Sequence, residues 1–225
     1  MDHHFLATTH LFRGASPQEV EAMLTCLQAV KKTYPRGASI LRAGDTSRSI
    51  GLVLSGSVSI ETDDIWGNKS ILDHAHAGQV FAETYACVPN EPLMINVVAA
   101  QTCEILFLDM SRVLHICANA CDFHNKLVRN LLTISSQKNL NLSRRIFHTS
   151  SKTIRGRLLS YLSFQSVKHG SREFEIPFNR QQLADYLSVD RSAMSNELSK
   201  MQREGLLTVD RSHFILLGQP PEVPL

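Results

Sequence analysis

A group of polar side chains near the carboxyl end of the chain could recognise nucleic-acid bases through hydrogen bonds. Arg191, Ser192, Ser195 and Asn196 fall close together, and Lys200 follows one helical turn later. An arginine can pair twice with guanine, an asparagine twice with adenine, and a serine with several base edges. If a helix presents these residues on one exposed face, its first turns can read bases in a major groove.

Two short helices joined by a tight turn are predicted to position this group. Asn179 can cap the first helix, with Gln182 as its reciprocal partner in a capping box, and Asp190 can cap the second. Gly205 follows the second helix as a residue just past a helix end often does. Apolar residues recur at spacings of three and four, which predicts one buried face on each helix: Leu183, Tyr186 and Leu187, then Met194, Leu198 and Met201.

A two-stranded hairpin is predicted directly after the second helix. Its strands cover residues 207–209 and 214–217 around a turn at 210–213, and a further strand is expected at 173–176. The hairpin resembles the wing of winged-helix domains. The alternative interpretation is an ordinary helical hairpin with a solvated polar face, and the wing favours DNA binding over it. Arg180 and Arg211 would then contact phosphate together with Lys200.

Composition and charge restrict the class of protein. The chain has 225 residues, with 43% apolar and 20% charged residues, which is typical of a soluble globular protein. No apolar run approaches membrane-spanning length, and no signal-peptide pattern opens the chain, so we expect a cytoplasmic protein without membrane contact. The net charge of +2 argues against general polyanion binding, whereas a local basic patch suffices for a specific DNA reader.

The five cysteines are scattered and form no CxxC pair. Neither a disulfide framework nor a zinc ribbon is therefore indicated. Cys117 and Cys121 would share one helix face, but two thiols make an incomplete metal site. We predict no metal and no bound cofactor.

The first half of the chain has the rhythm of a β-roll. Gly44, Gly56, Gly67 and Gly78 fall every 11 or 12 residues between short segments rich in β-forming residues. This spacing predicts antiparallel strands that close into a roll or barrel. The predicted strands cover 50–54, 58–62, 70–74, 79–81, 94–99 and 104–108, with helices at 17–30, 110–121 and 122–147 and from about 151 to 168.

The helix at 122–147 is long enough to need a partner along its length. Leu127, Leu131 and Ile134 keep heptad spacing, but Lys138 and Asn141 are next in phase. A dimer seam is thus predicted in the first half only. The same residues could instead cover the open face of the roll, and the two interpretations are compatible.

In its order of parts the chain resembles the family of the cyclic-AMP receptor protein and Fnr (Crp/Fnr). The resemblance runs from about Leu11 to Leu217 and rests on LADYLSVDRSAMSNELSKMQREGLL, PRGASILRAGD and LVLSGSVSI. It implies an α+β protein with an amino-terminal antiparallel β-roll (a cyclic-nucleotide-binding-like, double-stranded β-helix), a long dimerisation helix and a carboxy-terminal winged helix-turn-helix. We expect a sensor domain at 1–121, a dimerisation helix and hinge at 122–148, and a DNA-binding domain at 149–225.

The resemblance also implies the roles of the partners and of single residues. Arg191, Ser192 and Asn196 stand where the family reads bases. Ser188 and Ser192 depart from a common glycine and glutamate, so the operator should differ from that of the best-known members. We expect a non-enzymatic transcription regulator that binds a near-palindromic double-stranded DNA site as a homodimer, and RNA polymerase if it activates.

The effector cassette at 78–94 departs further from the family pattern. Glu83 matches, but Leu93 and Met94 replace the Arg-Ser pair that holds the cyclic phosphate. A phosphate buried without a guanidinium would lose a charge-assisted pair of hydrogen bonds. We therefore predict that cyclic AMP is not the effector. A small apolar molecule, or none, would bind at Glu83, Thr84, Tyr85, Leu93 and Met94.

His74 and His76 suggest two alternative functions. Alternate residues of a strand point to one face, so both imidazoles could reach one metal ion, as in cupin-like metal-dependent enzymes. Glu83 lies too far along for the usual cupin spacing, and no later flanked histidine completes the set. A haem-based sensor that uses either histidine is the other alternative.

Overall fold

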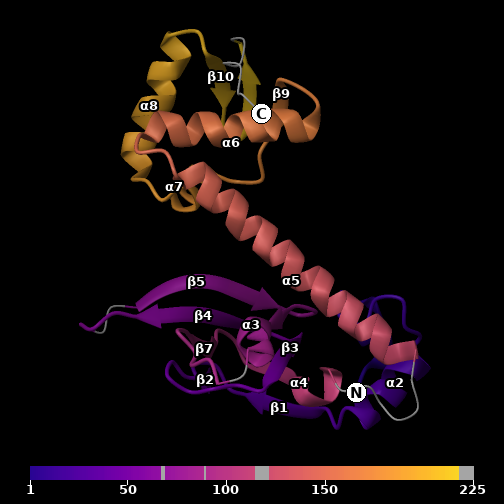
Figure 1. Cartoon of the computed structure of the whole chain (residues 1–225). Helices are drawn as coiled ribbons and strands as arrows, with labels where there is room; N and C mark the ends of the chain where they lie inside the picture. The colour runs from indigo at the N-terminus through magenta and orange to yellow at the C-terminus, as the bar shows by residue number, and fades with distance from the viewer. Residues whose placement is uncertain (67–68, 89, 115–121, 218–225) are drawn as a thin grey trace. The chain divides into compact units, whose positions relative to one another are not determined.

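A computed structural model describes residues 1–66, 69–88, 90–114 and 122–217 of the chain (Figure 1). The chain forms two compact units, Met1–Gln137 and Lys138–Leu225, which we describe separately. The boundary falls inside helix α5 (Asp122–Thr149). None of the described helices combines the length and the hydropathy needed to cross a bilayer.

The first unit begins with two short helices, α1 (His3–Thr8) and α2 (Pro17–Cys26). Ser16 and Glu19 form a capping box at the start of α2, where the Ser16 N–H donates to Glu19 Oε2 at 2.6 Å. The helix predicted to continue to residue 30 ends at Cys26 instead. The chain turns through Gln28, which has a positive φ of 48°, and residue 30 already belongs to a strand.

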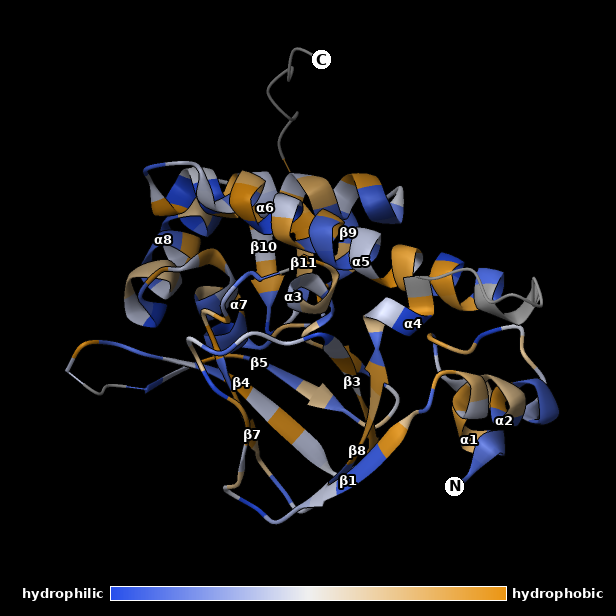
Figure 2. Ribbon diagram, turned by 60° about the horizontal axis from the view of Figure 1, so that its bottom comes forward, coloured by the Kyte–Doolittle hydropathy of each residue, from blue (hydrophilic) through white to orange (hydrophobic). Residues whose placement is uncertain are grey.

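Two four-stranded antiparallel sheets follow, with strand orders β1-β8-β3-β6 and β2-β7-β4-β5. They form the predicted roll, and a short helix α3 (Glu83–Cys87) follows β6. The strands are β1 (Val30–Tyr34), β2 (Ser39–Leu41), β3 (Ser49–Ser55), β4 (Ser57–Asp63), β5 (Lys69–His76), β6 (Val80–Phe81), β7 (Asn96–Ala99) and β8 (Cys103–Asp109). Hydrophobic residues colour much of β3 and β8, the two central strands of one sheet (Figure 2).

The six predicted strands of the roll are present, and sequence patterns missed two more. Strand β1 is an edge strand that carries two lysines and is exposed along most of its length. It therefore lacks the alternation of apolar and polar residues that marks a half-buried strand. Strand β2 is only three residues long.

The first half of α5 belongs to the core of the first unit. Leu127 and Leu131 are 1% and 5% exposed and pack with buried residues of α1, α2 and β3, with Ile134 at the margin of this cluster. Lys126 donates to the Gly14 carbonyl at 3.0 Å, and Asn130 donates to the Leu11 carbonyl at 3.0 Å. These residues therefore cover the unit's own core, as one of the two compatible interpretations expected, and the dimer seam stays a prediction.

Helix α4 (Met110–Leu114) lies between β8 and α5. The remainder of the helix predicted at 110–121 lies outside the described residues. Cys117 and Cys121, considered as a thiol pair, lie there too.

The second unit is a winged helix-turn-helix. After the last turns of α5 it contains α6 (Ile154–His169), β9 (Glu173–Glu175), α7 (Arg180–Leu187), α8 (Arg191–Arg203), β10 (Leu207–Asp210) and β11 (His213–Leu216). The strands form one antiparallel sheet in the order β10-β11-β9. Its core contains Leu158, Phe174, Leu183, Leu198 and Phe214, each at most 4% exposed. The caps predicted at Asn179 and Asp190 are confirmed, and α6 is capped by Thr153.

Candidate nucleic-acid interface

Helix α8, which is predicted to read bases, is fixed by its caps and by one buried face. The Asp190 carboxylate accepts the Ala193 N–H at 2.8 Å. Met194, Leu198 and Met201 are at most 2% exposed, so the helix turns its other side outward. The predicted apolar face of the second helix is thereby confirmed, because residues three and four apart share one side of a helix.

The outward side of α8 carries the residues predicted to read bases. Arg191, Ser192, Asn196 and Lys200 are exposed, and Ser195 is half-buried. The Ser192 hydroxyl donates to Asp190 Oδ1 at 2.5 Å, and the Ser195 hydroxyl donates to the Arg191 carbonyl at 2.8 Å. Both serines thus spend their one donor locally and keep acceptor lone pairs. Among the described residues, no hydrogen bond or ion pair engages the Arg191 guanidinium or the Asn196 amide.

Asp190 keeps its negative charge at the start of this helix. The hydrogen bond from Ser192, followed by those from backbone N–H groups, holds the pKa of Asp190 below its ordinary value. A carboxylate at a helix N-terminus is favourable for the helix dipole. It also leaves Arg191 as the cationic group next to the cap.

Three arginines surround one open groove beside the reading helix. The groove has a volume of about 700 Å³ and reaches from the start of α7 to the turn of the wing. Arg180, Arg191 and Arg211 contribute the cations, and Arg211 stands at the wing turn with a positive φ of 52°. The remaining lining residues are Ile176, Pro177, Phe178, Asn179, Gln181, Gln182 and Ser212. Such a groove fits a polyanionic backbone better than an apolar ligand.

Arg180 combines this cationic role with packing. Its guanidinium carbon lies 5.5 Å from the centre of the Phe214 ring, a cation–π distance. Burial lowers the pKa of Arg180 from its ordinary value, although an arginine stays charged at neutral pH. Lys200, the other predicted phosphate ligand, is exposed on α8. The hydrogen bond from Arg155 lowers the pKa of the nearby Glu204, and the charge of Lys200 lowers it further.

A charged contact that sequence patterns missed ties α6 to the reading helix. Arg155 donates to Glu197 Oε1 at 2.5 Å and to the two carboxylate oxygens of Glu204 at 2.7 and 3.0 Å. The bonds to Glu204, then those to Glu197, raise the pKa of Arg155, and the arginine lowers the pKa of Glu204. The partners are separated by 42 and 49 residues, so no local spacing reveals them.

The predicted effector residues differ widely in exposure. Glu83 is 4% exposed and Leu93 is 2% exposed, but Met94 is 74% exposed and Thr84 is exposed as well. The half-buried Tyr85 accepts the Met94 N–H at its hydroxyl, at 3.4 Å. Leu93 and Met94 thus differ sharply in burial, and Met94 lies in a bend just before β7.

The interior of the roll next to this cassette is filled by the chain's own side chains. Phe81 is fully buried, and its ring lies against the backbone of Gly51, where an added Cβ would be 2.1 Å from the ring Cζ. Val53, Val58 and Val97 pack in the same cluster and are fully buried. Ala82 then adopts a left-handed conformation, with φ 60°, at the start of α3.

His74 and His76, the residues of the two alternative functions, lie side by side on β5. Their rings stack with centroids 6.3 Å apart, and both side chains are exposed. Across the described ranges, no group of three or more histidine, cysteine, aspartate or glutamate side chains could hold a metal ion. Two imidazoles alone make an incomplete set for a cupin-like centre.

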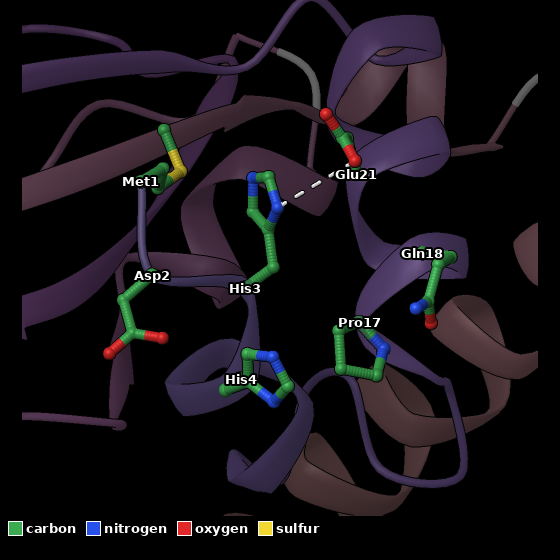
Figure 3. Close-up of a pocket in the computed structure, with 7 residues that line it drawn as sticks. All are labelled: Met1, Asp2, His3, His4, Pro17, Gln18 and Glu21. Atoms are coloured by element: carbon green, nitrogen blue, oxygen red, sulfur yellow. Dashed lines mark ion pairs between the residues drawn. The ribbon is translucent and has the colours of Figure 1, made fainter.

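An open hollow of about 270 Å³ lies between the amino-terminal residues that lead into α1 and the first turns of α2 (Figure 3). His3 Nδ1 is 4.0 Å from Glu21 Oε2 there, the limit for an ion pair. The other lining residues are Met1, Asp2, His4, Pro17 and Gln18. Its described lining residues include one weakly paired histidine and do not form a catalytic or metal-binding group.

Two family models match the chain, one in each unit. The cyclic nucleotide-binding domain matches residues 31–120, and the Crp-like helix-turn-helix domain matches residues 156–221. Among curated proteins, the chain is 22% identical over 199 residues to the CRP-like protein Clp of Xanthomonas campestris, covering 84% of each. It is also 22% identical over 193 residues to electron transport regulator A of Shewanella oneidensis, covering 83% of this chain and 74% of that protein.

Solved structures share the fold at low identity. The c-di-GMP responsive global regulator CLP of Xanthomonas campestris aligns with a TM-score of 0.54 and 19% identity, covering 91% of this chain and all of that one. The catabolite activator protein of Thermus thermophilus aligns with a TM-score of 0.51 and 20% identity, covering 92% and 93%. Because both units match, in the order of β-roll then helix-turn-helix, the chain belongs to the Crp/Fnr family of transcription regulators.

Proposed function

We propose that the protein is a sequence-specific DNA-binding regulator that reads a near-palindromic operator as a homodimer in the cytoplasm. The observation that carries the proposal is the outward face of α8, where Arg191 and Asn196 are exposed and make no hydrogen bond or ion pair among the described residues. Side chains held ready in this way can pair with guanine and adenine. Arg180, Lys200 and Arg211 flank them as phosphate ligands.

The test begins with selection of an operator from random duplex DNA, followed by binding measurements across a salt series. Arg191→Ala should cost about 1–3 kcal/mol on the operator and relax base preference at one position. Lys200→Ala should weaken binding to all duplexes and lower the salt slope by about 0.9 for each subunit that binds. Equal losses on every sequence for Arg191→Ala would contradict the base-reading role.

A homodimer would place two reading helices about one DNA turn apart. With Leu127 and Leu131 in the core of the first unit, the seam needs other side chains of α5. Leu132, Leu142 and Ile146 are 66%, 62% and 69% exposed. Native mass spectrometry of protein from its own cells should report a dimer together with any ligand or haem that co-purifies. A monomer at the concentration that saturates the operator would contradict the proposal.

The regulator would respond to an effector other than cyclic AMP. The cassette at 78–94 contains neither arginine nor lysine, so a cyclic phosphate would find no cation in it. The exposure of Met94 and the filled interior at Phe81 further support this proposal. Calorimetry should detect no saturable binding of cyclic AMP. Parallel titrations with c-di-GMP, to which the Clp relative responds, and with apolar small molecules would identify the effector class.

A further inference from the structure

The turn between α7 and α8 is held by two arginines from outside the helix-turn-helix. Arg145 donates from Nη2 to the Asp185 carbonyl at 3.1 Å and from Nε to the Tyr186 carbonyl at 3.2 Å. Arg157 donates from Nη1 to the Leu187 carbonyl at 3.0 Å and to the Ser188 carbonyl at 2.8 Å. Four successive carbonyls at the end of α7 therefore each accept a bond from a guanidinium.

These bonds satisfy a need that every helix end has. The last four carbonyls of an α-helix lack intrahelical partners, and cations near that end are favoured by the helix dipole. Arg145 belongs to the last turns of α5, and Arg157 belongs to the first turn of α6. The Arg157 Nε also donates to the Ser151 carbonyl at 2.8 Å, so the segment between α5 and α6 is tied into the same contact.

The contact lies only a few residues before the base-reading side chains. The last bound carbonyl belongs to Ser188 and α8 begins at Arg191, so only two residues separate the bound carbonyls from this helix. Ser188 adopts a left-handed conformation, with φ 54°, that is costly for a residue with a Cβ. Asp190, which caps α8, follows two residues later. A shift of the α7 end would therefore move the start of α8.

The fold of the unit does not depend on these two side chains alone. Leu183, Ala184 and Leu187 anchor α7 in the core and are fully buried. Arg145 is exposed, and hydrogen bonds at the surface contribute little to stability compared with this apolar burial. The bonds are better suited to fix an angle than to hold the unit folded.

From this geometry we propose that Arg145 and Arg157 are positioning residues that set the reading helix for base recognition. The inference rests on the proposed function of α8. Base contacts need geometry accurate to a fraction of an ångström, whereas phosphate attraction tolerates displacement. Loss of either arginine should thus lower the affinity for the operator and leave non-specific affinity almost unchanged.

The experiment compares Arg145→Met with the matched control Arg144→Met in the full chain. Arg144 precedes Arg145 on α5 and carries the same charge, but it bonds Asn141 and lies over the Phe164 ring instead of the α7 end. For each protein we would measure affinity for the selected operator and for an unrelated duplex over a salt series. We expect Arg145→Met to lower the ratio of the two affinities about tenfold, the size of one good base contact. Arg144→Met should keep the ratio.

Two further variants separate geometry from charge. Arg145→Lys keeps the cation but lacks the planar fork that spans two carbonyls, so it should lose discrimination with an unchanged salt slope. Arg157→Met should resemble Arg145→Met, and unfolding curves would show whether it remains folded. Amide hydrogen exchange should rise at residues 188–191 in Arg145→Met and not elsewhere in the unit.

Each outcome has one interpretation. Equal losses on both duplexes with a lower salt slope would mean that Arg145 binds phosphate directly, and this would overturn the inference. A retained affinity ratio would overturn it as well. A wild-type protein that binds all duplexes equally would overturn the proposed function itself. In that case the hydrogen-exchange measurement at residues 188–191 would still test whether Arg145 holds the turn between α7 and α8.

Discussion

A methyl group added at Gly51 should expel the Phe81 ring from the interior of the roll. The two residues are paired across β3 and β6, and an added Cβ would lie 2.1, 2.5 and 2.6 Å from three ring atoms. The backbone at Gly51 has no positive φ, so alanine adds steric overlap without backbone strain. Because Phe81 is fully buried, its ring can yield only by displacing the neighbouring core.

The expected cost of Gly51→Ala is about 1–3 kcal/mol, the usual penalty for overpacking a core. Phe81→Leu alone should cost roughly 1–2 kcal/mol, a part of the 3–5 kcal/mol for complete truncation of a buried phenylalanine. In the double variant the leucine leaves room for the new methyl group. The combined loss should therefore fall short of the sum by about 0.5–3 kcal/mol.

Calorimetry and urea unfolding followed by circular dichroism would measure these free energies. The transition of the first unit should move by roughly 3–5 °C per kcal/mol, and that of the second unit should stay. The single variants are the controls for the double variant. A Gly51→Ala protein that melts with the wild type, or strictly additive losses, would refute the packing argument.

Three further changes test the second unit. Ser188→Gly should stabilise it by about 1 kcal/mol, because glycine carries no penalty at a left-handed helix end, and a lower urea midpoint would contradict this. Leu198→Ala should destabilise it by roughly 2–5 kcal/mol through a cavity under α8, as measured by urea unfolding. Burial, then Arg144, lowers the pKa of His148, so its contribution to stability is complete above about pH 6.5 and is lost as the pH falls through the folded-state value. His148→Phe should remove this part of the pH dependence, and an unchanged profile of unfolding free energy between pH 5 and 7.5, roughly the range in which histidine titrates, would count against it.

The helix-turn-helix could be predicted from sequence because its signals are local. The caps at Asn179 and Asp190 act within one turn, and the apolar period of α8 is complete within the helix. The sequence could not predict what the apolar stripe at Leu127 and Leu131 packs against, because the same heptad pattern suits a second chain or the unit's own core. An apolar helix face indicates that it packs against another surface, but the sequence of the helix does not identify that surface.

The effector residues show a different limit. Leu93 and Met94 stand in place of two neighbouring family residues, yet Leu93 is buried and Met94 is exposed. Adjacency in the sequence does not show which of the two side chains is buried, because Met94 lies in a bend before β7 begins. By contrast, the bonds that Arg145, Arg155 and Arg157 donate to α7, α8 and Glu204 join residues at least 30 positions apart, and only the folded unit brings them together.

The contacts of these three arginines suggest how a change in α5 or α6 would reach α8. Arg155 bonds the middle and the end of α8, while Arg145 and Arg157 bond the end of α7. The last turns of α5 and the start of α6 thus contact both helices of the motif through directional hydrogen bonds. A ligand changes an equilibrium only through contacts that differ between two states. An effector that alters the last turns of α5 would act on DNA recognition by keeping or breaking the Arg145 contacts. Regulation of this kind would change the ratio of operator to non-specific affinity more than the stability of the unit, because α8 is anchored by its buried face at Met194, Leu198 and Met201 and not by Arg145.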